Sequence, residues 1–97
     1  MDCHFSRKAE EDLESIADYI ASDNPRRALS YISELRTRCH SLVTFPEAAV
    51  LKPEFGEGIR MTPFGRYLIF YTVQATCVRV ERILAGERLL SNHDFTA

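Results

Sequence analysis

Apolar residues recur with a helical period in two stretches of the first half of the chain. The first apolar stripe comprises Ala9, Leu13, Ile16, Ala17 and Ile20. The second comprises Ala28, Ile32, Leu35, Cys39 and Leu42. Each spacing places its apolar side chains on one face of a helix. Ser6 is the predicted N-cap of the first helix, which ends at 22–24. Asn24 and Pro25 begin the second helix, which is predicted to end near Phe45.

The second half of the chain favours strands. Segments 59–62, 66–73 and 77–84 are rich in β-branched and aromatic residues, and a short alternation at 2–5 predicts a further strand. Prolines and glycines in 46–58 indicate a long irregular loop. The order is therefore β-α-α-β-β-β. It predicts one α+β domain over residues 1–97, in which a helical hairpin packs on a small, mostly antiparallel sheet.

The side-chain pattern within the last two strands predicts their places in the sheet. Segment 66–73 is apolar or aromatic on both faces, which is typical of a central strand. In segment 77–84, regular alternation places Val78, Val80, Arg82 and Leu84 on one face. An arginine among apolar neighbours is expected to have a partner.

Composition and length indicate one ordinary soluble domain. The chain has 97 residues, of which 45% are hydrophobic and 27% charged. Its longest apolar run, 67–73, is far shorter than the roughly 20 residues that span a bilayer, and its start is polar. We therefore expect no membrane association and a cytoplasmic location. The odd number of distant cysteines, Cys3, Cys39 and Cys77, favours reduced thiols over a disulfide framework.

Charge is distributed unevenly along the chain. The net charge is −2, yet the basic residues of 60–88 are all arginines, whereas acids dominate the first half. Arginine favours planar, bidentate contacts to carboxylate or phosphate. We expect Arg60, Arg66, Arg82 and Arg88 to form a cationic sheet face that binds a macromolecular target. The alternative is ordinary surface ion pairing, for example of Arg79 or Arg82 with Glu81.

Other clusters carry no site. The acidic run from Glu10 to Glu14 is expected to be a solvated helix face. Cys3-His4 and Cys39-His40 are neighbours whose side chains point apart, and no Cys-x-x-Cys spacing exists, so no metal site is predicted. The chain has no glycine-rich phosphate loop, and no cofactor is expected.

Several spaced motifs resemble the RelE/ParE toxin superfamily. They are segments 58–60 (Gly-Ile-Arg), 63–71 (Pro-Phe-Gly-Arg-Tyr-Leu-Ile-Phe-Tyr) and 80–88 (Val-Glu-Arg-Ile-Leu-Ala-Gly-Glu-Arg), preceded by similar segments at 5–6, 9–13, 16–20, 24–25 and 45–47. The resemblance covers nearly the whole chain. It implies a toxin of a bacterial toxin–antitoxin pair, and the helical hairpin with the Gly-Arg-Tyr strand is more similar to the ParE-like branch. ParE-like sequences often carry a histidine where this chain has Ala85.

The resemblance implies a non-enzymatic inhibitor of DNA gyrase that a cognate antitoxin neutralises in a hetero-oligomer. The alternative is a RelE-like, ribosome-dependent mRNA endonuclease. RNA cleavage requires a general base and acid, for which this chain offers His93, Tyr67 and Tyr71. The negative net charge disfavours ribosome docking and direct specific nucleic-acid binding.

The antitoxin site is predicted on aromatic residues that the core leaves exposed. The resemblance implies that an antitoxin segment lays apolar side chains across the helices and adds a strand to a sheet edge. We expect Leu13, Ile16, Leu35 and Leu42 to be buried in the protein's own core. Tyr19, Tyr31 and Phe55 are then the predicted antitoxin contacts.

Overall fold

A computed structural model describes residues 1–87 of the chain. Its elements are β1 (Asp2–Phe5), α1 (Arg7–Ala21), α2 (Pro25–Ser41), β2 (Val50–Leu51), the 3-10 helix η1 (Pro53–Phe55), β3 (Arg60–Phe64), β4 (Tyr67–Val73) and β5 (Cys77–Ala85). The predicted α+β class and the predicted helices and strands are confirmed. The segment predicted to be a loop also contains β2 and η1, which are too short to leave a periodic pattern.

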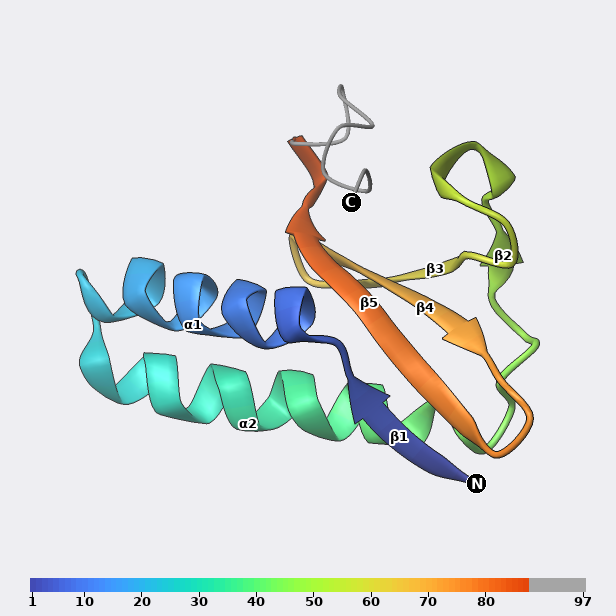
Figure 1. The fold of residues 1–97 in the computed structure, drawn as a ribbon. Helices are drawn as coiled ribbons and strands as arrows, with labels where there is room; N and C mark the ends of the chain where they lie inside the picture. Colours follow the sequence, from blue (N-terminus) through green and yellow to red (C-terminus); the bar gives the residue numbers. More distant parts are fainter. Residues whose placement is uncertain (88–97) are drawn as a thin grey trace.

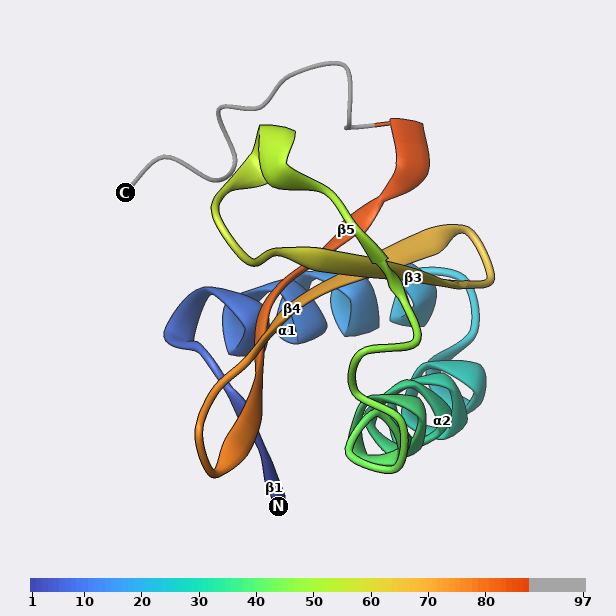
Figure 2. The same cartoon turned by 90° about the vertical axis from the view of Figure 1, so that its right-hand side faces the viewer.

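The strands form one sheet in the order β1-β5-β4-β3-β2, in which β1 is parallel to β5 and the other neighbours are antiparallel. The antiparallel helices α1 and α2 lie together on one face of this sheet (Figures 1 and 2). This is the predicted arrangement, and it follows from two amphipathic helices that need one apolar partner surface.

Side-chain caps start both helices where the sequence predicts. The Ser6 hydroxyl accepts a hydrogen bond from the N–H of Ala9 at 3.0 Å, and the Asn24 side chain accepts one from the N–H of Arg27 at 3.1 Å. α2 ends at Ser41, before the predicted Phe45. After Ser41 the backbone N–H groups bond to carbonyls three residues earlier, so the chain continues as tight turns instead of α-helix.

Two apolar clusters lie on opposite faces of β4. The larger cluster joins the helices to the sheet and comprises Ala9, Leu13, Ile16, Leu35, Cys39, Leu42, Tyr67, Ile69, Tyr71, Val78, Val80 and Ile83. It includes all four predicted core leucines and isoleucines. The smaller comprises Ile59, Phe70 and Leu84, with Phe55, Met61 and Leu68 packed against it. β4 is therefore the central strand that its two apolar faces predict.

A β-bulge in β5 changes which of its side chains share a face. Phe70 is opposite Arg82, but the next residue, Tyr71, is opposite Val80, so Glu81 is an extra residue. As a result Val80 shares the helix-facing cluster with Ile83, while Leu84 belongs to the opposite cluster. The prediction that Val78, Val80, Arg82 and Leu84 share one face is wrong, because alternation was assumed to continue through the bulge.

The start of α1 covers the edge of β5 that β1 leaves open. β1 pairs with β5 only as far as Val80. Beyond that point the Ser6 hydroxyl donates to the carbonyl of Glu81 at 2.7 Å, and the Asp12 carboxylate accepts from the N–H of Ile83 at 2.9 Å. Two side chains thus continue the hydrogen bonding that a longer β1 would provide.

Pro63 lies at the opposite side of the sheet, in β3. Lys52 donates its N–H to the carbonyl of Ile59, so alternate residues 59, 61 and 63 direct their backbone groups toward the outer edge. The nitrogen of Pro63 therefore faces outward and interrupts no bond to β4, which explains why the strand accepts a proline. Within residues 1–87, no helix is long and apolar enough to cross a membrane.

Candidate functional site

The arginines predicted to form one cationic face are dispersed over the structure. Arg60 lies opposite Tyr71 and donates to the carbonyls of Glu47 at 3.0 Å and Ala49 at 2.8 Å. It therefore holds the segment that precedes β2 against β3. Arg88 lies outside the described residues. The exposed Arg79 pairs with Glu81 at 2.7 Å, as the ion-pair alternative predicts.

Arg82 forms a bidentate ion pair with Asp12 inside the protein. Its Nε and Nη2 atoms donate to the two carboxylate oxygens of Asp12 at 2.8 and 2.9 Å. The two side chains are only 12% and 9% exposed. Arg82 is therefore not the solvent-facing cation that the sequence suggested.

Asp12 is likewise not part of a solvated acidic face. The prediction is wrong for this residue because α1 crosses the open edge of β5 and buries the carboxylate there. A signal was present in the sequence: Asp12 follows Ala9 by three residues and precedes Ile16 by four, so it lies beside the apolar stripe. The neighbouring Glu11 does behave as predicted and pairs with Arg7 on the surface.

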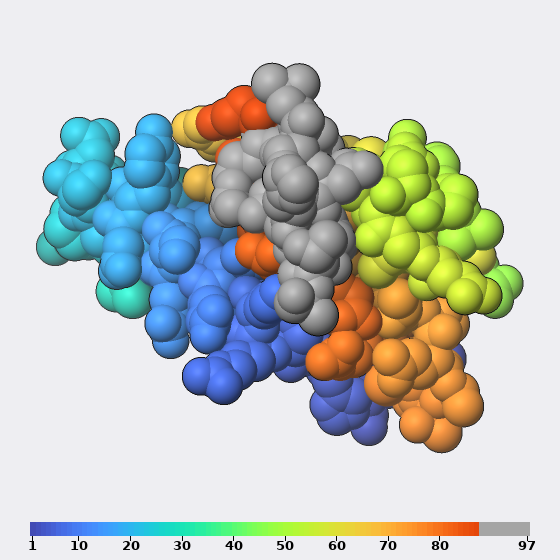
Figure 3. Space-filling view, turned by 45° about the horizontal axis from the view of Figure 1, so that its top comes forward, coloured from blue at the N-terminus to red at the C-terminus, as the bar shows by residue number. Residues whose placement is uncertain are grey.

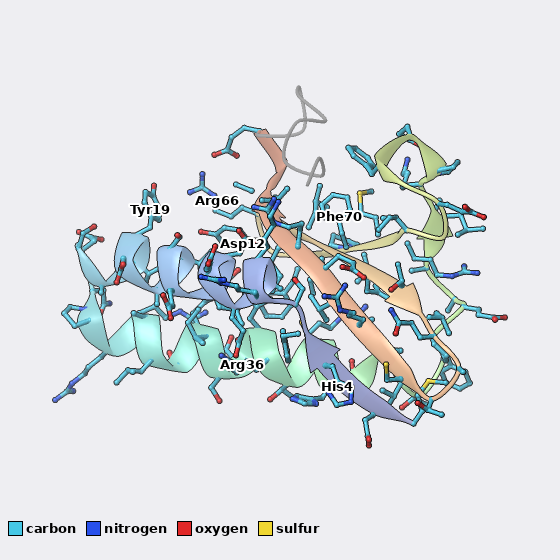
Figure 4. All side chains as sticks on the ribbon, in the orientation of Figure 1. His4, Asp12, Tyr19, Arg36, Arg66 and Phe70 are labelled. Carbon is cyan, nitrogen blue, oxygen red and sulfur yellow. The ribbon has the colours of Figure 1, made fainter. Side chains whose placement is uncertain are left out.

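Among the predicted target-binding arginines within residues 1–87, Arg66 is the one whose side chain is half exposed. It lies in the β3–β4 turn, where Gly65 has a φ of 58°, and its side chain is 50% exposed. Figure 4 shows Arg66 beside Tyr19. The Cζ of Arg66 lies 5.4 Å from the ring centroid of Tyr19 and 5.9 Å from that of Tyr67, so two aromatic rings support it. Its Nη2 donates to Glu87, and hydrogen bonds with Tyr19 and Glu87 raise the pKa of Arg66.

A cleft of about 260 Å³ lies beneath Arg66, between α1 and the adjoining ends of β4 and β5. It is lined by Asp12, Ser15, Ile16, Tyr19, Arg66, Tyr67, Ile83, Ala85 and Glu87. Tyr19 is 62% exposed, as predicted. In Figure 3, atoms of β5 (orange) lie between α1 (blue) and the segment around η1 (yellow-green).

The other two predicted antitoxin contacts are partly buried. The ring of Tyr31 packs edge-on against Phe64, with 5.5 Å between centroids, and the ring of Phe55 packs against Phe70 at 5.2 Å. Their predicted exposure is therefore wrong. Tyr31 faces the β3–β4 hairpin, and η1 folds Phe55 back onto the second apolar cluster.

Neither candidate catalytic tyrosine is presented to solvent. Tyr67 and Tyr71 are 6% and 0% exposed, and burial raises the pKa of both. The Tyr71 hydroxyl donates to the carbonyl of Pro46 at 2.8 Å, a structural contact between β4 and the loop after α2. The third candidate, His93, lies outside the described residues.

A second exposed surface lies around β2, where the sequence indicated only a loop. Phe45, Val50 and Leu51 are 76%, 62% and 50% exposed. Beside them, a groove of about 300 Å³ runs between the end of α2 and β3 and is lined in part by Leu42, Phe45 and Tyr71. Contiguous exposed apolar groups are typical of protein interaction surfaces and ligand-binding grooves.

The cysteines and histidines of the described region do not converge. Residues 1–87 contain no group of three His, Cys, Asp or Glu side chains that could hold a metal ion. Cys39 is buried in the core, while Cys3 and Cys77 are partly buried.

Comparison with known proteins identifies a matching protein family. Residues 4–90 match the family model described as the ParE toxin of the type II toxin–antitoxin system parDE. Among curated protein sequences, none matches this chain.

Two solved structures illustrate the similarity in fold. A chain of the chromosomal ParDE toxin–antitoxin system from P. aeruginosa aligns with a TM-score of 0.77 and 20% identity, over 88% of this chain and 95% of that one. YafQ from E. coli strain BL21(DE3) aligns with a TM-score of 0.53 and 13% identity, over 93% and 98%. At these identities the likeness concerns the fold alone.

Proposed function

The chain belongs to the ParE toxin family of type II toxin–antitoxin systems, and from this premise we propose that it inhibits DNA gyrase by binding it and that a cognate antitoxin neutralises it. In this proposal the protein breaks no bond itself. Its cellular effect arises from occupying a surface of a larger enzyme, in the bacterial cytoplasm.

The burial of Tyr67 and Tyr71 is the observation that carries this choice over RNA cleavage. A metal-independent ribonuclease needs a base and an acid within hydrogen-bond reach of the ribose and the leaving oxygen. The sheet face opposite the helices is instead covered by the apolar cluster around Phe70. The net charge of −2 also disfavours docking on ribosomal RNA.

Among the four predicted target-binding arginines, we propose Arg66 as the one that contacts the target. Its guanidinium is half exposed and is oriented by two aromatic rings, which leaves planar donors available to a partner carboxylate. Arg60 and Arg82 are engaged with the loop before β2 and with Asp12, so their proposed roles are structural. A target contact by Arg88 remains a prediction.

Exposed apolar side chains support the proposed antitoxin complex. Tyr19 at the mouth of the cleft, and Phe45, Val50 and Leu51 near β2, would lose contact with water in such a complex. We propose that the antitoxin covers these residues, and that Tyr31 and Phe55 support the contact surface from beneath.

A pair of reactions tests the proposed target. Purified protein is added to a gyrase supercoiling reaction and to an in vitro translation reaction, each with and without the cognate antitoxin. Loss of supercoiling with intact translation, reversed by the antitoxin, is the expected result. Blocked translation with cleaved messenger would replace the proposal with the RelE-like alternative.

A further inference from the structure

The cleft between α1 and the ends of β4 and β5 has the chemistry of a peptide-binding site. We propose that it receives a segment of the antitoxin in which a carboxylate side chain adjoins an apolar one. The carboxylate binds Arg66 at the rim, and the apolar side chain enters the cleft. This inference rests on the proposed function, because it identifies the part of the toxin that the antitoxin recognises.

The interior of the cleft suits an apolar side chain. Ile16, Tyr67, Ile83 and Ala85 supply apolar lining. The one carboxylate at the inner end, that of Asp12, already accepts hydrogen bonds from Arg82 and Ile83. The cleft volume of about 260 Å³ lies below the roughly 300–1,000 Å³ of drug-sized ligand sites, so a side chain fits it better than a cofactor.

The rim of the cleft supplies a preorganised cation. Tyr19 and Tyr67 hold the guanidinium of Arg66 at ring-centroid distances of 5.4 and 5.9 Å. A supported guanidinium loses less side-chain freedom when it binds a carboxylate, which favours affinity. The charge of Arg66 therefore determines the class of group that binds beside the apolar cleft.

The carboxylate now paired with Arg66 can be exchanged. Glu87 is 65% exposed, and its pair with Arg66 lies at the surface, where such pairs contribute little to stability. An incoming acidic side chain can replace Glu87 at Nη2 while its apolar neighbour becomes buried. The partner gains an ion pair together with hydrophobic burial, whereas the free toxin gains only the ion pair.

Ala85 leaves space at the wall of the cleft. It lies opposite Tyr67 in the β4–β5 ladder, and its methyl group is all that it contributes to the lining. A larger side chain at this position would fill the volume that the partner is proposed to occupy. Substitution at Ala85 therefore tests the cleft independently of substitution at Arg66.

The experiment measures binding of the full-length antitoxin by isothermal titration calorimetry. Arg66→Gln removes the cation, and Ala85→Phe fills the cleft. Each is expected to weaken binding by about tenfold or more, which is typical of a residue near an interface centre. Arg26→Gln is the matched control for Arg66→Gln on an exposed position of α2, and it should not change the affinity. Circular dichroism confirms that every variant is folded.

Short overlapping peptides from the antitoxin then identify the bound segment. The binding peptide is expected to contain Asp or Glu next to a large apolar residue. Its Asp→Asn or Glu→Gln form should bind the wild-type toxin more weakly. The same change should have little further effect on Arg66→Gln, because the two substitutions remove one interaction.

The outcomes separate this inference from the proposed function. If the antitoxin binds Arg66→Gln and Ala85→Phe as tightly as the wild type, the cleft is not its site, although the toxin–antitoxin pairing stands. If the antitoxin binds neither the wild type nor any variant, the proposed neutralisation itself fails. A self-associating toxin that Ala85→Phe renders monomeric would show instead that a second copy occupies the cleft, and would overturn the inference.

Discussion

Replacing Asp12 should cost more stability than replacing any other acidic residue of α1. Its carboxylate accepts three hydrogen bonds, two from Arg82 at 2.8 and 2.9 Å and one from the N–H of Ile83 at 2.9 Å. The Asp12 side chain is 9% exposed and that of Arg82 is 12% exposed. Asp12→Ala would therefore deprive a nearly buried guanidinium of its carboxylate and an N–H at the β5 edge of its acceptor.

The expected magnitude follows from these two losses. Removing one partner of a buried ion pair costs about 3–5 kcal/mol, because the remaining charge stays desolvated. The N–H of Ile83 adds to the same penalty, although the two contributions overlap. A domain of this size is stable by about 5–15 kcal/mol, so the loss is a large fraction of the total. The melting temperature should fall by about 12–40 °C.

Urea denaturation followed by circular dichroism and tyrosine fluorescence measures the change, and the absence of tryptophan leaves the tyrosine signal unobscured. Glu11→Ala is the matched control, because Glu11 pairs with Arg7 on the surface and should contribute at most about 1 kcal/mol. The double variant Asp12→Ala/Arg82→Met should be more stable than Asp12→Ala alone, since it also removes the nearly buried guanidinium that has lost the Asp12 carboxylate. A cost below about 1 kcal/mol for Asp12→Ala, or strictly additive single effects, would refute the reasoning.

Three further predictions concern the hairpin turn, the first helix and the core. Gly65→Ala should destabilise the protein by about 1–3 kcal/mol in thermal denaturation, because Gly65 has a φ of 58° and a Cβ would lie 2.8 Å from the Tyr31 hydroxyl. Gly58→Ala is the control, because Gly58 also has a positive φ, 76°, but a Cβ added there would meet no atom within 4 Å. It should destabilise the protein less than Gly65→Ala, and equal destabilisation would argue against the steric contact with Tyr31. Ser6→Ala should lower the free energy of unfolding by about 1–2 kcal/mol, measured in urea, since it removes both a helix cap and a bond to β5; an unchanged value would contradict both roles. Burial raises the pKa of the Cys39 thiol to about 12, so iodoacetamide at pH 8 should label Cys39 only after denaturation, as read by mass spectrometry; labelling of the folded protein would contradict the burial.

Local signals in the sequence were sufficient to predict where the helices start and which strand is central. Ser6 and Asn24 cap their helices through contacts three residues away, so their role is visible without the rest of the fold. The two apolar faces of β4 likewise predict burial on both sides. The short β2 strand was missed because two residues carry no periodicity.

The site residues were harder to predict, because their positions depend on how the elements meet. The bulge at Glu81 is a property of the register between two strands, and no residue in β5 alone indicates it. The partner of Arg82 lies 70 positions away, on a helix whose crossing of β5 depends on the whole fold. Arg66 and Tyr19 also meet only in three dimensions, so the sequence identified both residues but not the cleft that they share.

The backbone nitrogen of Pro63 has a consequence for how many partners one molecule can bind by strand addition. Beyond the two residues of β2, this side of the sheet offers no N–H at position 63, whereas the opposite side ends in the four residues of β1. Head-to-tail stacking of sheets needs two complementary strand edges, and the sheet formed by residues 1–87 has only one of useful length. A sheet that is extended at β1 by one partner strand should therefore not continue to grow through further copies of this protein. This favours discrete complexes over filaments, even at high concentration.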